Sequence, residues 1–132
     1  MTRDSVAYPL EGKRILVLDD DHPILETTQQ FLSLIKAIPV AFHHPPTAIE
    51  WLKTHHEACD AVLTDIHMPD MDGYQVTHLI RNYIGLLHLP IIAVTGEDLH
   101  DQSPEIVSAG FSGLIRKPFD PDALVELIRS HV

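Results

Sequence analysis

Side chains that can bind metal ions or phosphate follow directly on short apolar runs of this sequence. Three carboxylates, Asp19, Asp20 and Asp21, come after residues 15–18, and later runs end in Asp65, Thr95 and Lys117. Clustered carboxylates repel one another and have raised pKa values unless a cation joins them. Brought to one place, these carboxylates would suit a hard divalent cation such as Mg²⁺, while the hydroxyl and the ammonium would suit phosphoryl oxygens. One carboxylate could then act as a nucleophile and form an aspartyl phosphate.

The apolar runs predict five short buried strands. They span residues 15–18, 40–42, 61–63, 91–94 and 114–115, which is too short for typical helices. The segments between them show helical spacing, so strand and helix alternate as (βα)5 in units of about 20 to 30 residues. Such alternation favours an α/β fold with a parallel sheet covered by helices on both faces, and ligands bind beyond the carboxyl ends of its strands.

Apolar spacing also predicts the buried faces of three helices. These faces comprise Ile24, Phe31 and Ile35 in the first helix, Val76, Leu79, Ile80 and Tyr83 in the third, and Leu124, Leu127 and Ile128 in the last. Asp120 is placed to cap the last helix, with Pro121 at its first position.

The fourth helix is predicted to be short, at residues 104–109. Ser103 and Pro104 are typical of a helix start, and Gly110 suits the position after the end. The loop before this helix, from Gly96 onward, is unusually long.

The composition of the chain excludes several classes of protein. A chain of 132 residues, 45% hydrophobic and 21% charged, fits one folded domain. Its single cysteine, Cys59, excludes an intrachain disulfide and is compatible with a reducing compartment. No apolar run approaches the roughly 20 residues that span a bilayer, and the net charge of −10 argues against direct nucleic-acid binding or membrane contact by this segment. We therefore expect a cytoplasmic domain that meets a cation or a basic partner surface.

The motifs "ILVLDDD", "DAVLTDIHMPDMDG", "PIIAVTGED" and "GLIRKPF" resemble, in order and spacing, those of the receiver domain of two-component response regulators. The resemblance covers residues 13–132 and leaves residues 1–12 as a leader or linker. It implies a flavodoxin-like, doubly wound (βα)5 sandwich whose five parallel strands lie in the order 2-1-3-4-5. The leader is similar to those that precede receivers at the ends of hybrid sensor histidine kinases, and a stand-alone regulator is the other context.

The resemblance also assigns roles to residues. Asp65 would be the phosphoacceptor. Mg²⁺ or Mn²⁺ would be held by Asp19, Asp20, Asp65 and the backbone carbonyl of His67. Thr95 and Lys117 would contact the phosphoryl group, and the Lys117–Pro118 peptide bond would be cis. The phosphoryl donor would be a histidine kinase or a histidine phosphotransfer protein, and a phosphorylation-dependent dimer is compatible with the family. The domain would be a signalling module, not an enzyme, because it catalyses only its own phosphorylation and dephosphorylation.

Leu114 departs from the family pattern. The family usually has Tyr or Phe three positions before the lysine, where it transmits the signal, and leucine cannot hydrogen-bond there. We therefore expect phosphorylation to change the loop at residues 96–103 more than any aromatic rotamer. Asp21 is interpreted as a cap of the first helix. His67 and Glu97, each two residues after a site residue, are candidates for tuning the lifetime of the phosphoryl group.

Two other interpretations belong to different classes of protein. One is a phosphatase of the haloacid dehalogenase type, with Asp19 and Asp21 forming its D-x-D motif. In that family the motif continues with Thr or Val two residues later, whereas here it continues with His22 and Pro23. The other is a pseudo-receiver that only binds partners, and the complete set of acidic residues with Thr95 and Lys117 argues against it.

Overall fold

A computed structural model describes residues 8–132. Strands and helices alternate along the chain as the sequence predicts. The strands are β1 (Arg14–Leu18), β2 (Ile38–Phe42), β3 (Ala61–Asp65), β4 (Ile91–Thr95) and β5 (Gly113–Arg116). The helices are α2 (His22–Leu34), α3 (Pro45–His55), the 3-10 helix η1 (His56–Ala58), α4 (Gly73–His78), the π-helix η2 (Leu79–Ile84), α5 (Pro104–Ala109) and α6 (Pro121–Arg129).

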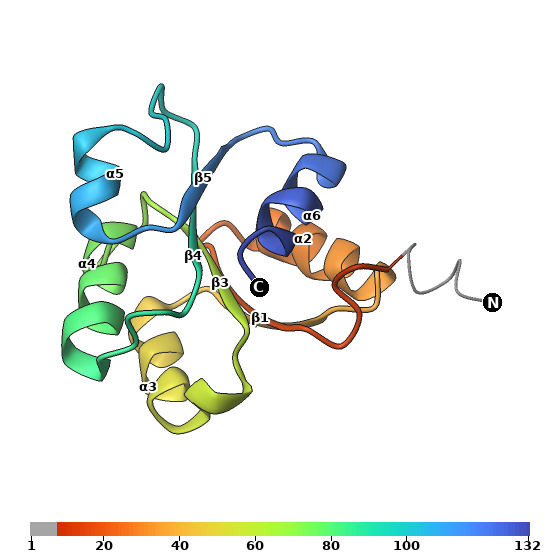
Figure 1. Cartoon of the computed structure of the whole chain (residues 1–132), viewed down its shortest axis with the longest axis horizontal. Helices are drawn as coiled ribbons and strands as arrows, with labels where there is room; N and C mark the ends of the chain where they lie inside the picture. Colours follow the sequence, from red (N-terminus) through yellow and green to blue (C-terminus); the bar gives the residue numbers. More distant parts are fainter. Residues whose placement is uncertain (1–7) are drawn as a thin grey trace.

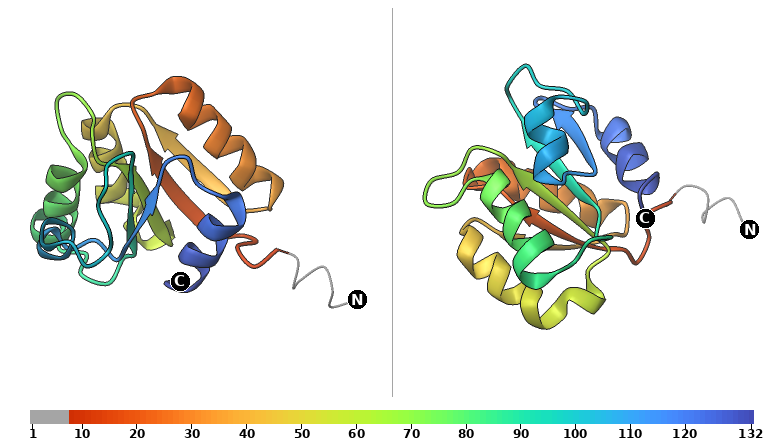
Figure 2. Two further views of the ribbon diagram at one scale, coloured as in Figure 1. Left: turned by 90° about the horizontal axis from the view of Figure 1, so that it is seen from above. Right: turned by 60° about the vertical axis from the view of Figure 1, so that its left-hand side comes forward.

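The five strands form one parallel sheet in the order β2-β1-β3-β4-β5, which confirms the predicted topology. Helices α2 and α6 cover one face, and α3, α4 and α5 lie on the other (Figures 1 and 2). Successive side chains of a strand point to opposite faces. Accordingly, Ile15 and Val17 of β1 pack with α2 and α6, whereas Leu16 and Leu18 pack with α3 and α4. Because the sheet is parallel, the carboxyl ends of all five strands lie at the same edge.

The buried face of α2 is displaced by one residue from the prediction. Leu25, Thr28 and Leu32 are buried, whereas Ile24 and Phe31 are only partly covered. The helix lies against the sheet beside α6, and its flank with Ile24 and Phe31 is left facing the loop before α6.

The third predicted helix is α-helical only at its start. Val76 and Ile80 are buried as predicted, but Tyr83 is 69% exposed, so its predicted place on the buried face is wrong. The chain widens into the π-helix η2 after His78. A π turn holds more residues than an α turn, so it rotates later side chains away from the face set by α-helical spacing.

The short fourth helix is confirmed as α5, Pro104–Ala109, with Ser103 at its N-cap and Gly110 after its end at φ +94°. The Ser103 hydroxyl does not cap the helix; it accepts the backbone N–H of His100 at 3.0 Å and so closes the preceding loop. Asp120 occupies the N-cap position of α6, but its side chain makes no capping hydrogen bond, contrary to the prediction.

Residues 8–12 of the predicted leader pack against the domain. Leu10 is fully buried in the core beside α2 and α6, and the Gly12 N–H donates to the Lys36 carbonyl at 2.9 Å. The rest of that leader lies outside the described residues, and the boundary at residue 13 stays a prediction. Among helices of residues 8–132, none has the length and apolar character needed to cross a bilayer.

Candidate functional site

The carboxyl ends of β1, β3 and β5 bring three carboxylates and one ammonium together. Carboxylate oxygens of Asp19, Asp20 and Asp65 lie within 4.8 Å of one another. The Lys117 Nζ lies 3.3 Å from an oxygen of Asp19 and 3.3 Å from an oxygen of Asp65. Asp19 and Asp65 are buried, and Thr95 ends β4 with no exposed surface. The residues that sequence reasoning selected at strand ends therefore meet at one edge of the sheet.

The charges at this edge perturb one another. Burial raises the pKa of the Asp19 carboxyl, and the nearby Asp65 carboxylate raises it further, while the Asp21 N–H and the Lys117 ammonium oppose the rise. Burial alone would lower the pKa of Lys117, but the two carboxylates outweigh that effect and raise it. Lys117 is thus held as a cation between two anions.

The oxygen donors of this cluster fit a hard divalent cation. Three carboxylates and one ammonium leave two negative charges in a small volume. The donor set contains only oxygen, with Asp20 the most exposed of the three, which matches the preference of Mg²⁺ for a few carboxylates and retained waters. The chemistry of the residues is therefore compatible with the predicted metal site.

Asp21 has a different role from its two neighbours. Its side chain accepts the backbone N–H of Ile24 at 3.1 Å and caps α2, which confirms the predicted cap. Its own N–H donates to Asp19 at 3.0 Å and helps to hold that carboxylate in place. A D-x-D nucleophile pair built from Asp19 and Asp21 is not favoured, since Asp21 faces the helix N-terminus and lies outside the carboxylate cluster.

The loops after β3 and β4 are joined beside the cluster. The His67 Nε2 lies 2.8 Å from a Glu97 carboxylate oxygen, and the Glu97 N–H donates to the Thr95 hydroxyl at 3.0 Å. This bond to Glu97 raises the pKa of His67. Sequence spacing placed both residues near the site, but no local signal indicated that they pair with each other.

The loop after Asp65 is drawn tightly against the site. Asp72 caps α4 through a reciprocal capping box with Gln75. The Gly73 N–H donates to the Ile66 carbonyl at 2.7 Å. A Cβ atom at position 73 would lie 2.6 Å from the Asp65 carbonyl oxygen, so only glycine fits there without a shift. The Lys117–Pro118 bond is cis, as predicted.

Comparison with known proteins decides the family. The response regulator receiver domain model matches residues 15–129.

The chain belongs to this family.

Relatives of this receiver domain occur both as response regulators and within kinases. It is 30% identical to putative two-component response regulator ARR21 of Arabidopsis thaliana, 31% to response regulator protein FleR of Pseudomonas aeruginosa and 31% to histidine kinase 3 of Arabidopsis thaliana. These matches cover 86%, 89% and 87% of the chain but only 18%, 24% and 13% of the relatives. The chain thus spans less than a quarter of the length of each of these three relatives.

Solved structures agree with the fold. A CheY-like receiver domain protein from Methanospirillum hungatei is 29% identical, with a TM-score of 0.78 over 91% of this chain and 93% of that one. Chemotaxis protein CheY4 of Vibrio cholerae gives a TM-score of 0.83 at 21% identity, over 92% of this chain and 99% of that one. The receiver domain is therefore a two-component signalling module with the predicted flavodoxin-like architecture.

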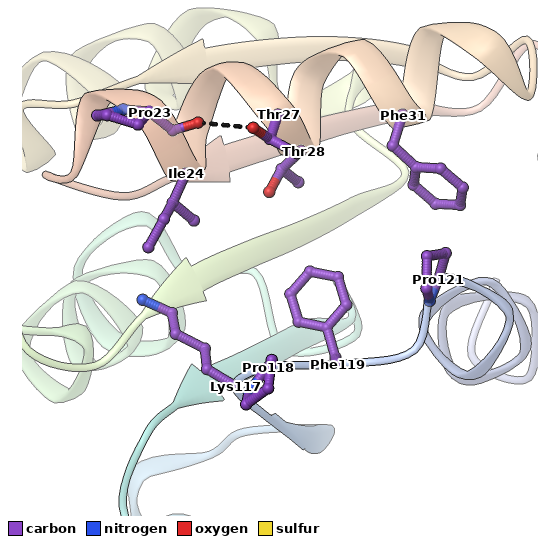
Figure 3. Close-up of a pocket in the computed structure, with 9 residues that line it drawn as sticks. All are labelled: Pro23, Ile24, Thr27, Thr28, Phe31, Lys117, Pro118, Phe119 and Pro121. Atoms are coloured by element: carbon purple, nitrogen blue, oxygen red, sulfur yellow. Dashed lines mark hydrogen bonds between the residues drawn. The ribbon is translucent and has the colours of Figure 1, made fainter.

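An apolar groove of about 670 Å³ borders the charged site of the receiver domain. Ile24 and Phe31 of α2 form one wall, and Pro118 and Phe119 of the loop before α6 form the other, with Lys117 at one end (Figure 3). Sequence reasoning missed this groove, because its walls come from segments about ninety residues apart.

Proposed function

We propose that this receiver domain accepts a phosphoryl group on Asp65 from a phosphohistidine. The observation that carries the proposal is the position of Lys117, whose ammonium lies 3.3 Å from both Asp19 and Asp65 at the mouth of the sheet. Asp65 is a buried carboxylate, and a carboxylate can act as a nucleophile. The Lys117 ammonium beside it can balance the negative charge of the phosphoryl group once that group is attached. Residues 13–132 would form the functional unit.

In the transfer step, a carboxylate oxygen of Asp65 attacks the phosphorus atom. The phosphorus–nitrogen bond of the donor breaks, and the neutral imidazole leaves after taking a proton. Lys117 is placed to pair with the transferred group, and the Thr95 hydroxyl can donate to one of its oxygens while still accepting the Glu97 N–H. Mg²⁺, held by Asp19, Asp20, Asp65 and the His67 carbonyl, would supply positive charge to the same oxygens.

The product stays on the protein, so the chemistry serves signalling and not turnover of a metabolite. The phosphoryl group shifts the population of conformations until water removes it. His67 and Glu97, which contact each other, are both more than half exposed and lie two residues after Asp65 and Thr95. We include in the proposal that this pair tunes the lifetime of the phosphoryl group by restricting the approach of water.

The apolar groove is where the proposed donor would dock. Lys117 lines one end of the groove and its ammonium lies 3.3 Å from Asp65, so a donor seated in the groove would lie beside the phosphoacceptor. Phe31 and Phe119 would contact apolar side chains of a histidine kinase or a phosphotransfer protein. Truncation of either phenylalanine should slow transfer from the protein donor but leave transfer from a small phosphodonor unchanged.

Intact mass after incubation with a small phosphodonor and Mg²⁺ tests the proposal. Wild type should gain one phosphoryl group, and Asp65→Asn should gain none. Asp21→Asn is the matched control, because asparagine caps helices as well as aspartate does and should leave uptake unchanged. A gain that survives in Asp65→Asn, or one that is lost only in Asp21→Asn, would overturn the assignment of the phosphoacceptor.

A further inference from the structure

A small apolar cluster lies between α4, α5 and β5, on the face of the sheet opposite to α2 and the groove (Figure 1). Ile66, Ala93 and Ile106 are buried at its centre. Tyr74, Leu99, Phe111 and Leu114 pack around them and remain partly exposed. Leu114 is the residue that stands where the family usually has an aromatic. The cluster nevertheless contains two aromatic rings, supplied by other elements.

These rings, Tyr74 and Phe111, pack against each other. Their centroids are 5.9 Å apart and their planes are inclined at 72°, the edge-to-face arrangement that aromatic pairs prefer. Tyr74 comes from the start of α4, and Phe111 comes from the turn between α5 and β5. The pair therefore bridges the loop that follows Asp65 to the end of α5.

Tyr74 is tied closely to the phosphoacceptor. Its neighbour Gly73 donates its N–H to the Ile66 carbonyl at 2.7 Å and packs directly on the Asp65 carbonyl. Ile66, the residue after Asp65, is fully buried in the same cluster. A shift of the backbone at Asp65 must therefore move the start of α4, because no space separates the two.

Acidic residues around Tyr74 connect it to the loop after β4 as well. Burial raises the pKa of its hydroxyl, and the carboxylates of Glu105, Glu97 and Asp72 add to the rise. Glu97 is also the residue whose N–H donates to the Thr95 hydroxyl. Leu99 of the same loop packs in the cluster with Tyr74, so movement of the loop after β4 reaches the ring through packing.

Arg81 holds the turn between α5 and β5, which carries Phe111, through hydrogen bonds. Its guanidinium donates to the Gly110 carbonyl at 3.0 and 2.9 Å, one residue before Phe111. It also donates to the carbonyls of Leu86 and Leu89 at 2.7 and 2.6 Å. Arg81 belongs to η2, which continues α4. Its hydrogen bonds therefore connect α4 and η2 to the turn that carries Phe111.

We propose that Tyr74 and Phe111 relay phosphorylation of Asp65 to α5, in place of an aromatic residue on β5. Leucine at position 114 has no ring to turn into the cluster and cannot form a hydrogen bond. Displacement of the backbone at Asp65 is therefore transmitted by the rings of Tyr74 and Phe111. The exposed surface of α5, which includes Val107 at 57% exposure, is then the surface that changes. This inference rests on the proposed function of Asp65.

Hydrogen exchange at residues 104–111 tests the relay. Exchange is measured with and without Mg²⁺ and beryllium trifluoride, a phosphoryl mimic, and intact mass records phosphoryl uptake from a small donor by the same samples. In wild type, exchange should change by about fivefold or more, the lower end of typical couplings between sites. Tyr74→Leu and Phe111→Leu should still take up the phosphoryl group but lose most of this change.

Tyr83→Leu is the matched control. It removes an exposed tyrosine of the same helical segment and should keep the wild-type response. Tyr74→Phe should keep it too, because the relay needs the ring. A leucine variant at position 74 or 111 that takes up phosphoryl and retains the full exchange response overturns the relay alone. Absence of phosphoryl uptake by wild type overturns the proposed function and the relay together.

Discussion

Replacement of Gly73 by alanine should destabilise the domain by forcing α4 away from the phosphoacceptor. The new Cβ would lie 2.6 Å from the Asp65 carbonyl oxygen and 2.9 Å from the Ile66 Cα. Carbon–oxygen contacts are rarely closer than about 3.3 Å, so the helix start must retreat by roughly 0.7 Å. Overpacking of this kind costs about 1–3 kcal/mol. Alanine recovers up to about 1 kcal/mol of helix propensity, so the net loss should be about 1 kcal/mol, the middle of the range that remains.

Urea unfolding of wild type and Gly73→Ala measures this loss as a lower midpoint at unchanged slope. Gly96→Ala is the control, because no atom lies within 4 Å of its Cβ, and its stability should stay within about 0.5 kcal/mol of wild type. Phosphoryl uptake by Gly73→Ala should also slow, since the displaced atoms include the Asp65 backbone. If Gly73→Ala is as stable as Gly96→Ala, the close contact between α4 and Asp65 is not as the structure describes it.

Three further outcomes are expected. Because burial raises the pKa of Asp19, its ionised form lowers the stability of the domain at neutral pH. Without Mg²⁺, Asp19→Asn should therefore have a higher melting temperature than wild type. The difference in melting temperature should shrink as the pH falls through the raised pKa of Asp19. A lower melting temperature would contradict this. The His67 imidazole should titrate above its ordinary pKa by NMR, and Glu97→Gln should bring it back; an unaltered titration would show that the pair does not form in solution. Arg81→Met should cost at least about 2 kcal/mol in denaturant unfolding, because backbone carbonyls lose a charged donor; a cost below about 1 kcal/mol would contradict the anchoring role.

Much of the site was predictable because its residues occupy equivalent places in a repeating pattern. Each follows a short apolar run, and parallel strands have their carboxyl ends at one edge of the sheet. The motifs around Asp65 and Lys117 then supplied the strand order through the family resemblance, and the fold confirms that order. Helix boundaries such as Ser103 and Gly110 were also predictable, since starts and ends of helices depend on a few adjacent residues.

The sequence by itself determined the alternation of strands and helices, the acidic edge and its lysine, because these depend on residue type and local spacing. Tertiary structure alone decided the pairing of His67 with Glu97, the contact of Gly73 with the Asp65 backbone and the burial of Leu10. It also decided that Tyr83 leaves the buried face where the helix widens. Each of these depends on how elements distant in the chain pack together, and packing distances of a few tenths of an ångström are not encoded in any short stretch of residues.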